Sequence, residues 1–332
     1  MNDGDQKVPS MLRELSQHEF GSRLEPYRRE LQVHCYRLLG SLHDAEDMVQ
    51  ETFLRAWTRR ATYTQDISVR AWLYKIATNI CLDALKKTRR RVIPKTLRDA
   101  EPSGDSVPPP ILEPIWLDPY PDDLIPWAAE HPEQVVVTRE SVSLAFMAAL
   151  HVLPPRQRAV LILSDVLDWS AAEIATLLET TVSAVKSALH RARASLDAAH
   201  PDVMAPRPDD FPLQTQLAAY VQAWETADVD ALITLLRDDA TFSMPPIPSW
   251  YQGKADIHQL VGARVFAGTP GLWRLLPAHA NGQIAFGLYR RGADGYAAYG
   301  VQVVTFASDA ISDIITFRKP DLVERFGLPT KL

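Results

Sequence analysis

The sequence predicts a multidomain chain with two all-α helical domains followed by an α+β domain. Apolar residues recur at helical spacing through residues 10–92 and again through 133–199. Ten prolines lie between Pro94 and Pro132 and separate the two stretches. Beyond a second proline-rich joint, segments rich in β-branched and aromatic residues are typical of strands. The predicted domains are 1–93, a linker at 94–132, then 133–200 and 201–332.

Composition restricts the class of protein. The 332 residues are 46% hydrophobic and 23% charged, which suits buried cores and excludes a disordered or collagen-like chain. Two cysteines, Cys35 and Cys81, are too few for a disulfide scaffold and indicate reduced thiols in a cytosolic protein. No uncharged apolar run reaches the roughly 18 residues of a membrane span, and the acidic N-terminus is unlike a signal peptide. We therefore expect a soluble cytoplasmic protein that makes no membrane contact.

The formal net charge of −6 hides an uneven distribution. Counting Lys and Arg against Asp and Glu gives +5 for residues 1–100, −8 for 101–140, 0 for 141–200 and −3 for 201–332. Positive charge is concentrated in one short window, which contains Lys86, Lys87, Arg89, Arg90, Arg91, Lys95 and Arg98. Such a cluster is typical of a surface that binds nucleic acid, whatever the average charge of the chain.

The first helical region contains three amphipathic stretches, within Leu31–Leu39, Ala45–Trp57 and Val69–Leu85. The acidic linker that follows contains residues too apolar for a pure spacer, namely Trp116, Leu117, Ile125 and Trp127. We expect parts of this linker to dock on a folded domain.

Residues 154–197 have the pattern of a helix-turn-helix. Ser170 and Glu173 can form a capping box, and Thr181 is a suitable N-cap for the next helix. The apolar stripe predicted for that helix is Val182, Val185, Leu189 and Leu196. Its opposite face carries polar and cationic residues: Ser183, Lys186, Ser187, His190, Arg191 and Arg193. Such a helix fits the major groove of DNA, where cations reach bases and phosphates. An amphipathic hairpin with a solvated charged face remains the alternative.

The last part of the chain changes class. Helices are predicted near 213–227 and 229–237. Strands are predicted over 272–280, 283–291, 296–307 and 310–318. Turn sequences such as Asn281-Gly282 separate the strands. Helices followed by a meander indicate an α+β domain.

Four segments of the chain resemble the extracytoplasmic-function (ECF) group of sigma-70 factors. They are Asp44–Trp57, Arg70–Asp83, Leu153–Arg158 and Lys186–Arg193, in the family's order and spacing across a proline-rich linker. The resemblance covers about residues 10–200. It implies that the first helical domain is sigma region 2, which binds core RNA polymerase and the −10 promoter element. It implies that the second is sigma region 4, which reads the −35 element. The family often has glycine in the helix-turn-helix turn where this chain has Glu179.

The resemblance also implies site residues in region 2. An acidic strip suited to a basic coiled coil, by resemblance the clamp of the polymerase, comprises Asp44, Glu46, Asp47, Gln50 and Glu51. The residues implied in −10 recognition and melting are Trp72, Tyr74, Lys75, Asn79, Asp83, Lys86, Lys87, Arg89 and Arg90. Aromatic, amide and cationic groups are what unstacked bases and phosphates require. A solvated acidic face, and a core position for Trp72, remain the alternatives.

The C-terminal domain resembles the SnoaL-like branch of the NTF2-like fold, a curved sheet wrapped by helices around a conical pocket. The resemblance rests on the helix order, on Phe242–Gly253 and on the final four strands. Candidate pocket residues are Trp224, Met244, Trp250, Tyr251, Trp273, His279 and Tyr289. Enzymes of this fold use an Asp or His as acid and base, for which Asp239, His258 and His279 are the candidates. None of the three sits in a catalytic motif, so no catalytic residue is predicted.

The leading hypothesis is a sigma factor, not an enzyme, whose fused C-terminal domain regulates it in cis by contacting the sigma domains. The partners expected are core RNA polymerase, promoter DNA and a small-molecule ligand of the pocket. The alternative is a SnoaL-type small-molecule enzyme that carries a DNA-binding module. A conventional repressor would leave the motifs within residues 44–91 unexplained. No metal-ligand motif, P-loop or GxGxxG sequence occurs, so neither a metal nor a cofactor is predicted.

Overall fold

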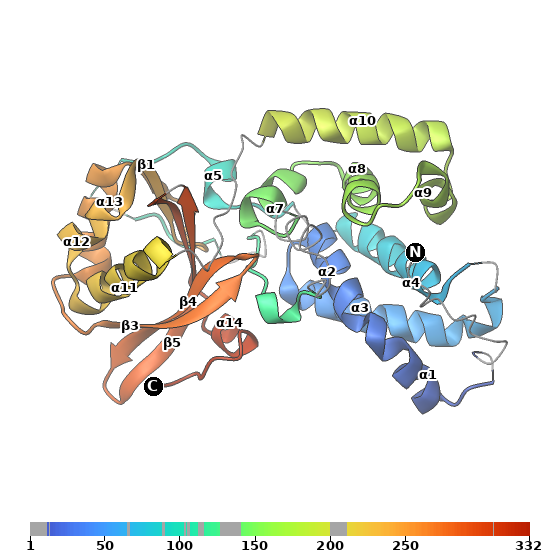
Figure 1. Cartoon of the computed structure of the whole chain (residues 1–332), viewed down its shortest axis with the longest axis horizontal. Coiled ribbons are helices and arrows are strands. Elements are labelled where there is room, and N and C mark those ends of the chain that lie inside the picture. The colour runs from blue at the N-terminus through green and yellow to red at the C-terminus, as the bar shows by residue number, and fades with distance from the viewer. Residues whose placement is uncertain are drawn as a thin grey trace. The chain divides into compact units, whose positions relative to one another are not determined.

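The chain forms two compact units in the computed structural model (Figure 1). Unit 1 comprises Met1–Arg91, Leu124–Thr138 and Ala149–Pro201, and unit 2 comprises Val92–Asp123, Arg139–Ala148 and Asp202–Leu332. The structure describes residues 12, 14–64, 67–87, 90–102, 104, 107–111, 116–126, 141–199, 211–307 and 309–332, without the side chains of 197–199 and 211–213. No helix in these ranges combines the length and apolarity that crossing a bilayer requires.

Four helices form the first half of unit 1. They are α1 (Gln17–Leu24), α2 (Arg28–Leu39), α3 (Leu42–Thr58) and α4 (Val69–Leu85). Ser41 and Ser68 cap α3 and α4, because each hydroxyl accepts a hydrogen bond from a first-turn backbone N–H. Gly40 ends α2 in the left-handed conformation, with φ of 70°, which glycine adopts without strain. The three amphipathic stretches predicted from the sequence are therefore confirmed as helices.

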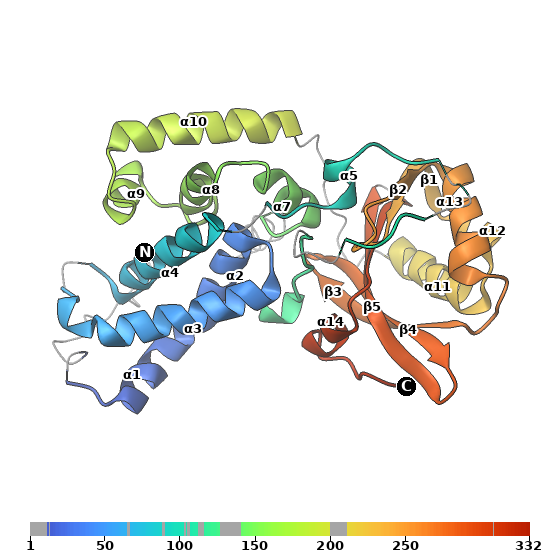
Figure 2. The ribbon, with the colours of Figure 1, turned by 180° about the vertical axis from the view of Figure 1, so that it is seen from behind.

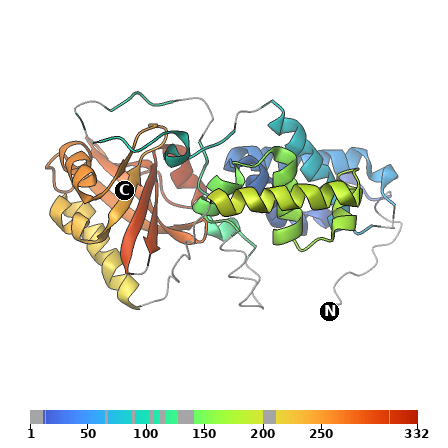
Figure 3. The same cartoon turned by 90° about the horizontal axis from the view of Figure 1, so that it is seen from above.

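The second half of unit 1 is the helix-turn-helix. Its helices are α8 (Pro155–Leu161), which continues into a π-helical turn at Ile162–Val166, α9 (Ala171–Leu177) and α10 (Val182–Ala199). The predicted capping box is confirmed, since Ser170 Oγ accepts from the Glu173 N–H and Glu173 Oε2 accepts from the Ser170 N–H. α10 packs on α8 and α9, and Figure 3 shows it running lengthwise over the other helices of the unit.

The apolar stripe predicted for α10 is right at its centre and wrong at its start. Val185 is buried, and Leu189 and Leu196 are half-buried. Val182 is 40% exposed, because it is the first residue of the helix. Ala192, which was not predicted to belong to the stripe, is fully buried.

Unit 2 is built on a six-stranded sheet in the order β2-β1-β6-β5-β4-β3. The strands are β1 (Leu236–Ser243), β2 (Trp250–Gln252), β3 (Trp273–Ala280), β4 (Gln283–Gly292), β5 (Gly295–Ala307) and β6 (Ala310–Phe317). β1 and β6 are parallel, and every other neighbouring pair is antiparallel. The four strands predicted from the sequence are confirmed, and so is the Asn281-Gly282 turn, where both residues have positive φ.

Helices pack against one face of this sheet. They are α11 (Phe211–Thr226), α12 (Val229–Thr234) and α13 (Lys254–Leu260). Tyr220 and Trp224 of α11 join Phe286 and other strand residues in one buried cluster. The helix predicted at 229–237 ends early, because β1 begins at Leu236. β1 escaped prediction because the three residues after Leu236, Arg-Asp-Asp, do not alternate between polar and apolar.

The linker lies on the C-terminal domain within unit 2. Figure 2 shows it passing beside β2, β1 and α13, close to the short helix α5 (Pro94–Leu97). Trp116 and Leu117 are buried, as the expectation of a docked linker requires. Ile125 is also buried, within unit 1, and Trp127 lies outside the described residues. The segment α7 (Leu144–Leu150) begins in unit 2, where the Leu144 N–H donates to Gln283 of β4.

Candidate nucleic-acid interface and C-terminal cavity

The recognition helix α10 presents all its predicted −35 residues to solvent. Ser183, Lys186, Ser187, His190, Arg191 and Arg193 are each exposed. Arg193 is held by Asp165 through two hydrogen bonds, of 2.9 and 2.7 Å. Within the described residues, neither Lys186 nor Arg191 has an ion-pair partner. The positive charge at these two positions is therefore available to a phosphate or a base edge.

In α4 the predicted −10 residues are only partly accessible. The Tyr74 side chain is buried, with its ring 4.8 Å from that of His34 and 5.6 Å from that of Trp169. Its hydroxyl donates to Glu30, which also accepts from Arg70, and burial raises the pKa of the phenol. Sequence reasoning missed this arrangement, because Trp169 is far away along the chain.

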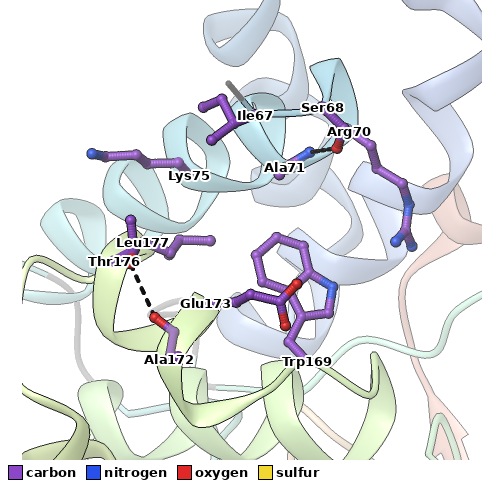
Figure 4. Close-up of a pocket in the computed structure, with 10 residues that line it drawn as sticks. All are labelled: Ile67, Ser68, Arg70, Ala71, Lys75, Trp169, Ala172, Glu173, Thr176 and Leu177. Carbon is purple, nitrogen blue, oxygen red and sulfur yellow. Dashed lines mark hydrogen bonds between the residues drawn. The ribbon is translucent and has the colours of Figure 1, made fainter. Parts of the chain in front are cut away.

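A groove of about 560 Å³ lies between α4 and α9. Figure 4 shows Ser68, Ala71 and Lys75 on one wall, with Glu173 and Leu177 on the other. Beside the groove the Lys75 ammonium pairs with the Glu179 carboxylate at 3.0 Å. Glu179 has φ of 51°, in the left-handed region where glycine is favoured. Glutamate in place of glycine at this turn therefore introduces local backbone strain, and its carboxylate binds Lys75 of α4.

Trp72 and Asn79 border a second cavity near the start of α4, of about 380 Å³. The Trp72 side chain is buried, and its ring lies 5.1 Å from that of Tyr63. The Asn79 side chain is exposed. The burial of Trp72 fits the core position that the sequence left as an alternative.

The basic run after α4 divides into a buried and an exposed part. Lys86, Lys87 and Arg90 are exposed, with Lys86 paired to Asp83 at 2.8 Å. Arg89 lies outside the described residues. Arg91 is buried and binds Asp44 at 2.5 Å.

The predicted acidic strip of α3 is less uniform than its sequence. Asp44 is engaged by Arg91, and Glu51 accepts from Arg55 at 2.6 Å. Asp47 and Gln50 are exposed, and Glu46 is half-buried. The part of the strip that faces solvent is thus centred on Asp47 and Gln50.

Arg158 was not singled out by the sequence, although its segment was. It is buried in unit 1, where its guanidinium donates to the Leu38 carbonyl at the end of α2 and to the carbonyls of His151 and Leu153. Burial lowers its pKa to about 9. A buried donor with several carbonyl partners connects the helix-turn-helix to the first four helices. No sequence signal distinguishes it from the neighbouring exposed Arg156.

The C-terminal domain contains a cavity of about 290 Å³. Three of the predicted pocket residues line it: Trp224, Met244 and Trp273. The other four are placed elsewhere. Trp250 donates to the Arg98 carbonyl of the linker, Tyr251 is in the buried cluster, His279 is exposed and Tyr289 donates to the Pro329 carbonyl. Sequence reasoning missed the arginines at the cavity, Arg264, Arg290 and Arg318.

None of the candidate acid–base residues lines this cavity among the described residues. Asp239 is exposed, and Arg237, which donates to it, lowers its pKa. His258 is exposed and bound to Asp230 at 3.0 Å. The described lining contains no Asp, Glu or His, so it offers no carboxylate or imidazole for proton transfer.

Comparison with known proteins finds family matches for three segments of the chain. Residues 24–91 match the family "Sigma-70 region 2", residues 143–196 match "Sigma-70, region 4" and residues 217–314 match "SnoaL-like domain". The ECF RNA polymerase sigma factor SigG of Mycobacterium tuberculosis is 44% identical over 318 residues, which are 95% of this chain and 85% of that protein.

A second relative is known by sequence and by structure. The ECF RNA polymerase sigma factor SigJ of Mycobacterium tuberculosis is 29% identical over 326 residues, which are 93% of this chain and 96% of that protein. Its crystal structure covers 93% of this chain and 99% of its own, with a TM-score of 0.56 and 25% identity. The sigma regions, their order and the appended SnoaL-like domain place this chain in the ECF RNA polymerase sigma factor family.

Proposed function

We propose that this sigma factor binds core RNA polymerase through α3, reads the −35 element with α10 and melts the −10 element with α4. We further propose that its C-terminal domain regulates these steps in cis by holding the linker. The names of the relatives, RNA polymerase sigma factors, support the first proposal. The exposed, cationic face of α10 supports its DNA-binding part.

The observation that carries the cis-regulation proposal is the Asn281 side chain. It lies in the turn between β3 and β4, where its Oδ1 accepts from the Tyr120 N–H at 2.7 Å and its Nδ2 donates to the Val142 carbonyl at 2.6 Å. Close by, Lys319 binds the buried Asp118 at 2.6 Å. One amide thus holds the chain on both sides of residues 124–138.

Docking on the sheet shortens the part of the linker that is free to connect regions 2 and 4. Regions 2 and 4 read separate promoter elements, and only the linker joins them. An extended chain spans at most about 3.6 Å per residue, so linker residues bound to the sheet are lost to the span. Release of the docked segments lengthens the free connection between α4 and α8. The C-terminal domain therefore opposes the open, promoter-bound arrangement.

Transcription with reconstituted polymerase tests this proposal. The template is a promoter selected from genomic fragments with the holoenzyme. Asn281→Gly removes the side-chain bonds to Tyr120 and Val142 and retains a residue that tolerates φ of 57°. We expect N281G to raise the yield of transcript several-fold. Gln222→Ala, which removes an exposed amide on α11, is the matched control and should leave the yield unchanged.

The two parts of the proposal fail in different ways. Equal yields from wild type, N281G and a truncation after His200 would remove the regulatory role. No transcript from any of the three would remove the promoter-directed function.

A further inference from the structure

We infer that the cavity of the C-terminal domain binds a small organic anion with a flat apolar body, beneath the docked linker. This inference deepens the proposed cis regulation and rests on it for its biological role. The binding itself requires neither polymerase nor DNA, so it can be tested independently.

The walls of the cavity are mainly apolar and include three aromatic rings. Trp273 is central, with its ring 5.9 Å from that of Trp224 and 4.9 Å from that of Tyr299, both in edge-to-face geometry. The other apolar lining residues are Val107, Met244, Ile247, Leu260, Val265 and Leu288. Aromatic walls of this kind bind flat apolar groups by burial and by ring contacts.

Positive charge borders these walls without a matching negative charge. Arg318 lies 5.3 Å from the ring centre of Tyr299, and Arg290 lies 5.9 Å from that of Trp273. Neither forms an ion pair with a carboxylate in the part of the chain that the structure describes. The Nε of Arg318 is also buried without a hydrogen-bond partner among the described residues. A buried donor without an acceptor is costly, and an anionic ligand would satisfy both the donor and the charge.

The linker covers part of the same cavity. Val107 is one of its lining residues, and Arg264, another, donates to the Gly104 carbonyl at 3.3 Å. On either side, the Glu101 N–H donates to the Trp250 carbonyl and the Ile111 N–H to the Pro246 carbonyl, each at 2.9 Å. A ligand in the cavity therefore contacts the linker and the sheet together, and its binding energy adds to linker docking.

Size and polarity define the class of ligand. About 290 Å³ lies at the small end of the range for ligand sites. The described lining residues include arginines but no acidic side chain. The combination favours a compact monoanion, such as a carboxylate or sulfonate on one or two fused rings, over a cation or a neutral polar molecule.

Two fluorescent probes with related bodies test the inference on the full-length protein. The anionic probe is 8-anilinonaphthalene-1-sulfonate, and the neutral probe is N-phenyl-1-naphthylamine, which lacks the sulfonate. We expect saturable one-site binding of the anionic probe. Arg318→Gln and Arg290→Gln should each weaken it about tenfold, because each removes a charge-assisted contact. Binding of the neutral probe should change less than about twofold.

Arg291→Gln is the matched control, since Arg290 and Arg291 are both exposed but only Arg290 lines the cavity. It should leave both affinities unchanged. Hydrogen exchange provides a second readout, in which the bound anion should slow exchange of the Glu101 and Ile111 amides.

Three results would overturn the inference. They are equal loss of both probes in R318Q, a loss in R291Q as large as in R318Q, and absence of saturable binding in the wild-type protein. Circular dichroism of each variant separates loss of binding from loss of fold.

Discussion

The two helices of unit 1 that we propose to contact the promoter, α10 and α4, differ in accessibility. α10 exposes all six of its predicted contact residues. α4 has Tyr74 buried against Trp169 and Lys75 paired with Glu179, both of which belong to the helix-turn-helix region. The same packing that leaves the polar face of α10 free thus covers part of α4. With the roles proposed for these helices, we expect −35 reading to need no rearrangement of unit 1 and −10 melting to need separation of α4 from α9.

The interactions that cover α4 differ in strength. The Lys75–Glu179 pair is largely exposed, since the Glu179 side chain is 76% accessible. Exposed pairs contribute about 0–1 kcal/mol. Arg158, in contrast, is buried with three carbonyl partners. The contacts between the helix-turn-helix and the first four helices are therefore strong at Arg158 of α8 and weak at Glu179, which follows α9. We expect α4 to separate from α9 before the Arg158 contacts break.

The largest effect is expected from removal of the Arg158 contacts. Arg158→Ala leaves the carbonyls of Leu38, His151 and Leu153 without their donor and creates a void. We expect a loss of about 3 kcal/mol in the free energy of unfolding of unit 1, measured by urea denaturation. Arg156→Ala removes an exposed arginine two residues away and should change stability by less than about 0.5 kcal/mol. Equal losses of stability in the two variants would contradict the role of Arg158 in joining the helix-turn-helix to the first four helices.

The next effect is a dependence of stability on pH. Burial lowers the pKa of His34 to about 3, below its ordinary value of 6.5, with Arg37 and Arg70 contributing. Above pH 6.5 the imidazole is neutral in both states, and below it the unfolded state binds a proton that the folded state excludes. The free energy of unfolding should therefore fall by up to about 1.4 kcal/mol per pH unit as the pH decreases towards 3.

His34→Leu isolates this contribution. His34 contacts Tyr74 and Thr78 of α4, so the variant is expected to be less stable at neutral pH but to show a shallower slope. A slope remains because burial also lowers the pKa of His151. Urea denaturation at several pH values measures the free energy of unfolding at neutral pH and its dependence on pH. A pH dependence that is unchanged in H34L would contradict the role of His34.

A smaller effect is expected at the exposed helix. Lys186→Ala and Arg191→Ala should each weaken promoter binding by the polymerase holoenzyme about tenfold and change its dependence on salt. Arg193→Ala should weaken it less, because Asp165 already engages that guanidinium. Filter binding at several KCl concentrations gives the affinity for the promoter and its dependence on salt. A larger loss of promoter affinity in R193A than in K186A would contradict the greater role predicted for Lys186.

The smallest effect is expected at Glu179. Glu179→Gln breaks the ion pair with Lys75 but keeps the strained backbone, and Glu179→Gly removes both. We expect each to raise the affinity of the free protein for a single-stranded −10 oligonucleotide by about two- to fivefold, measured by fluorescence anisotropy. If neither variant raises the affinity, the Lys75–Glu179 pair does not hold α4.

Local patterns in the sequence predicted the secondary-structure elements. The burial and the contacts of their side chains depend on residues that are distant in the sequence. The capping box at Ser170, the Asn281-Gly282 turn and the polar face of α10 depend on neighbouring residues, so periodicity and turn chemistry found them. The burial of Tyr74 depends on Trp169, and the docking of Tyr120 depends on Asn281. Such pairs are fixed by tertiary packing, which periodicity does not encode.

The C-terminal cavity illustrates the same limit. Trp224, Met244 and Trp273 were found because large apolar side chains are common in pockets. Arg290 and Arg318 were not found, since a charged residue near the end of a strand usually faces solvent. The tertiary fold brings the two arginines to one cavity, although they lie at the ends of different strands.

The distance between α4 and α9 tests the central claim most directly. Spin labels at Leu82→Cys of α4 and Thr176→Cys of α9, neither of which is a predicted promoter contact, report this distance by pulsed electron resonance, and the native cysteines are buried. A second pair, Thr176→Cys with the exposed Ser195→Cys, lies within the helix-turn-helix and serves as the control. The account predicts that core RNA polymerase with promoter DNA lengthens the first distance and leaves the second unchanged. An α4–α9 distance that is the same in the free and the promoter-bound protein would contradict it.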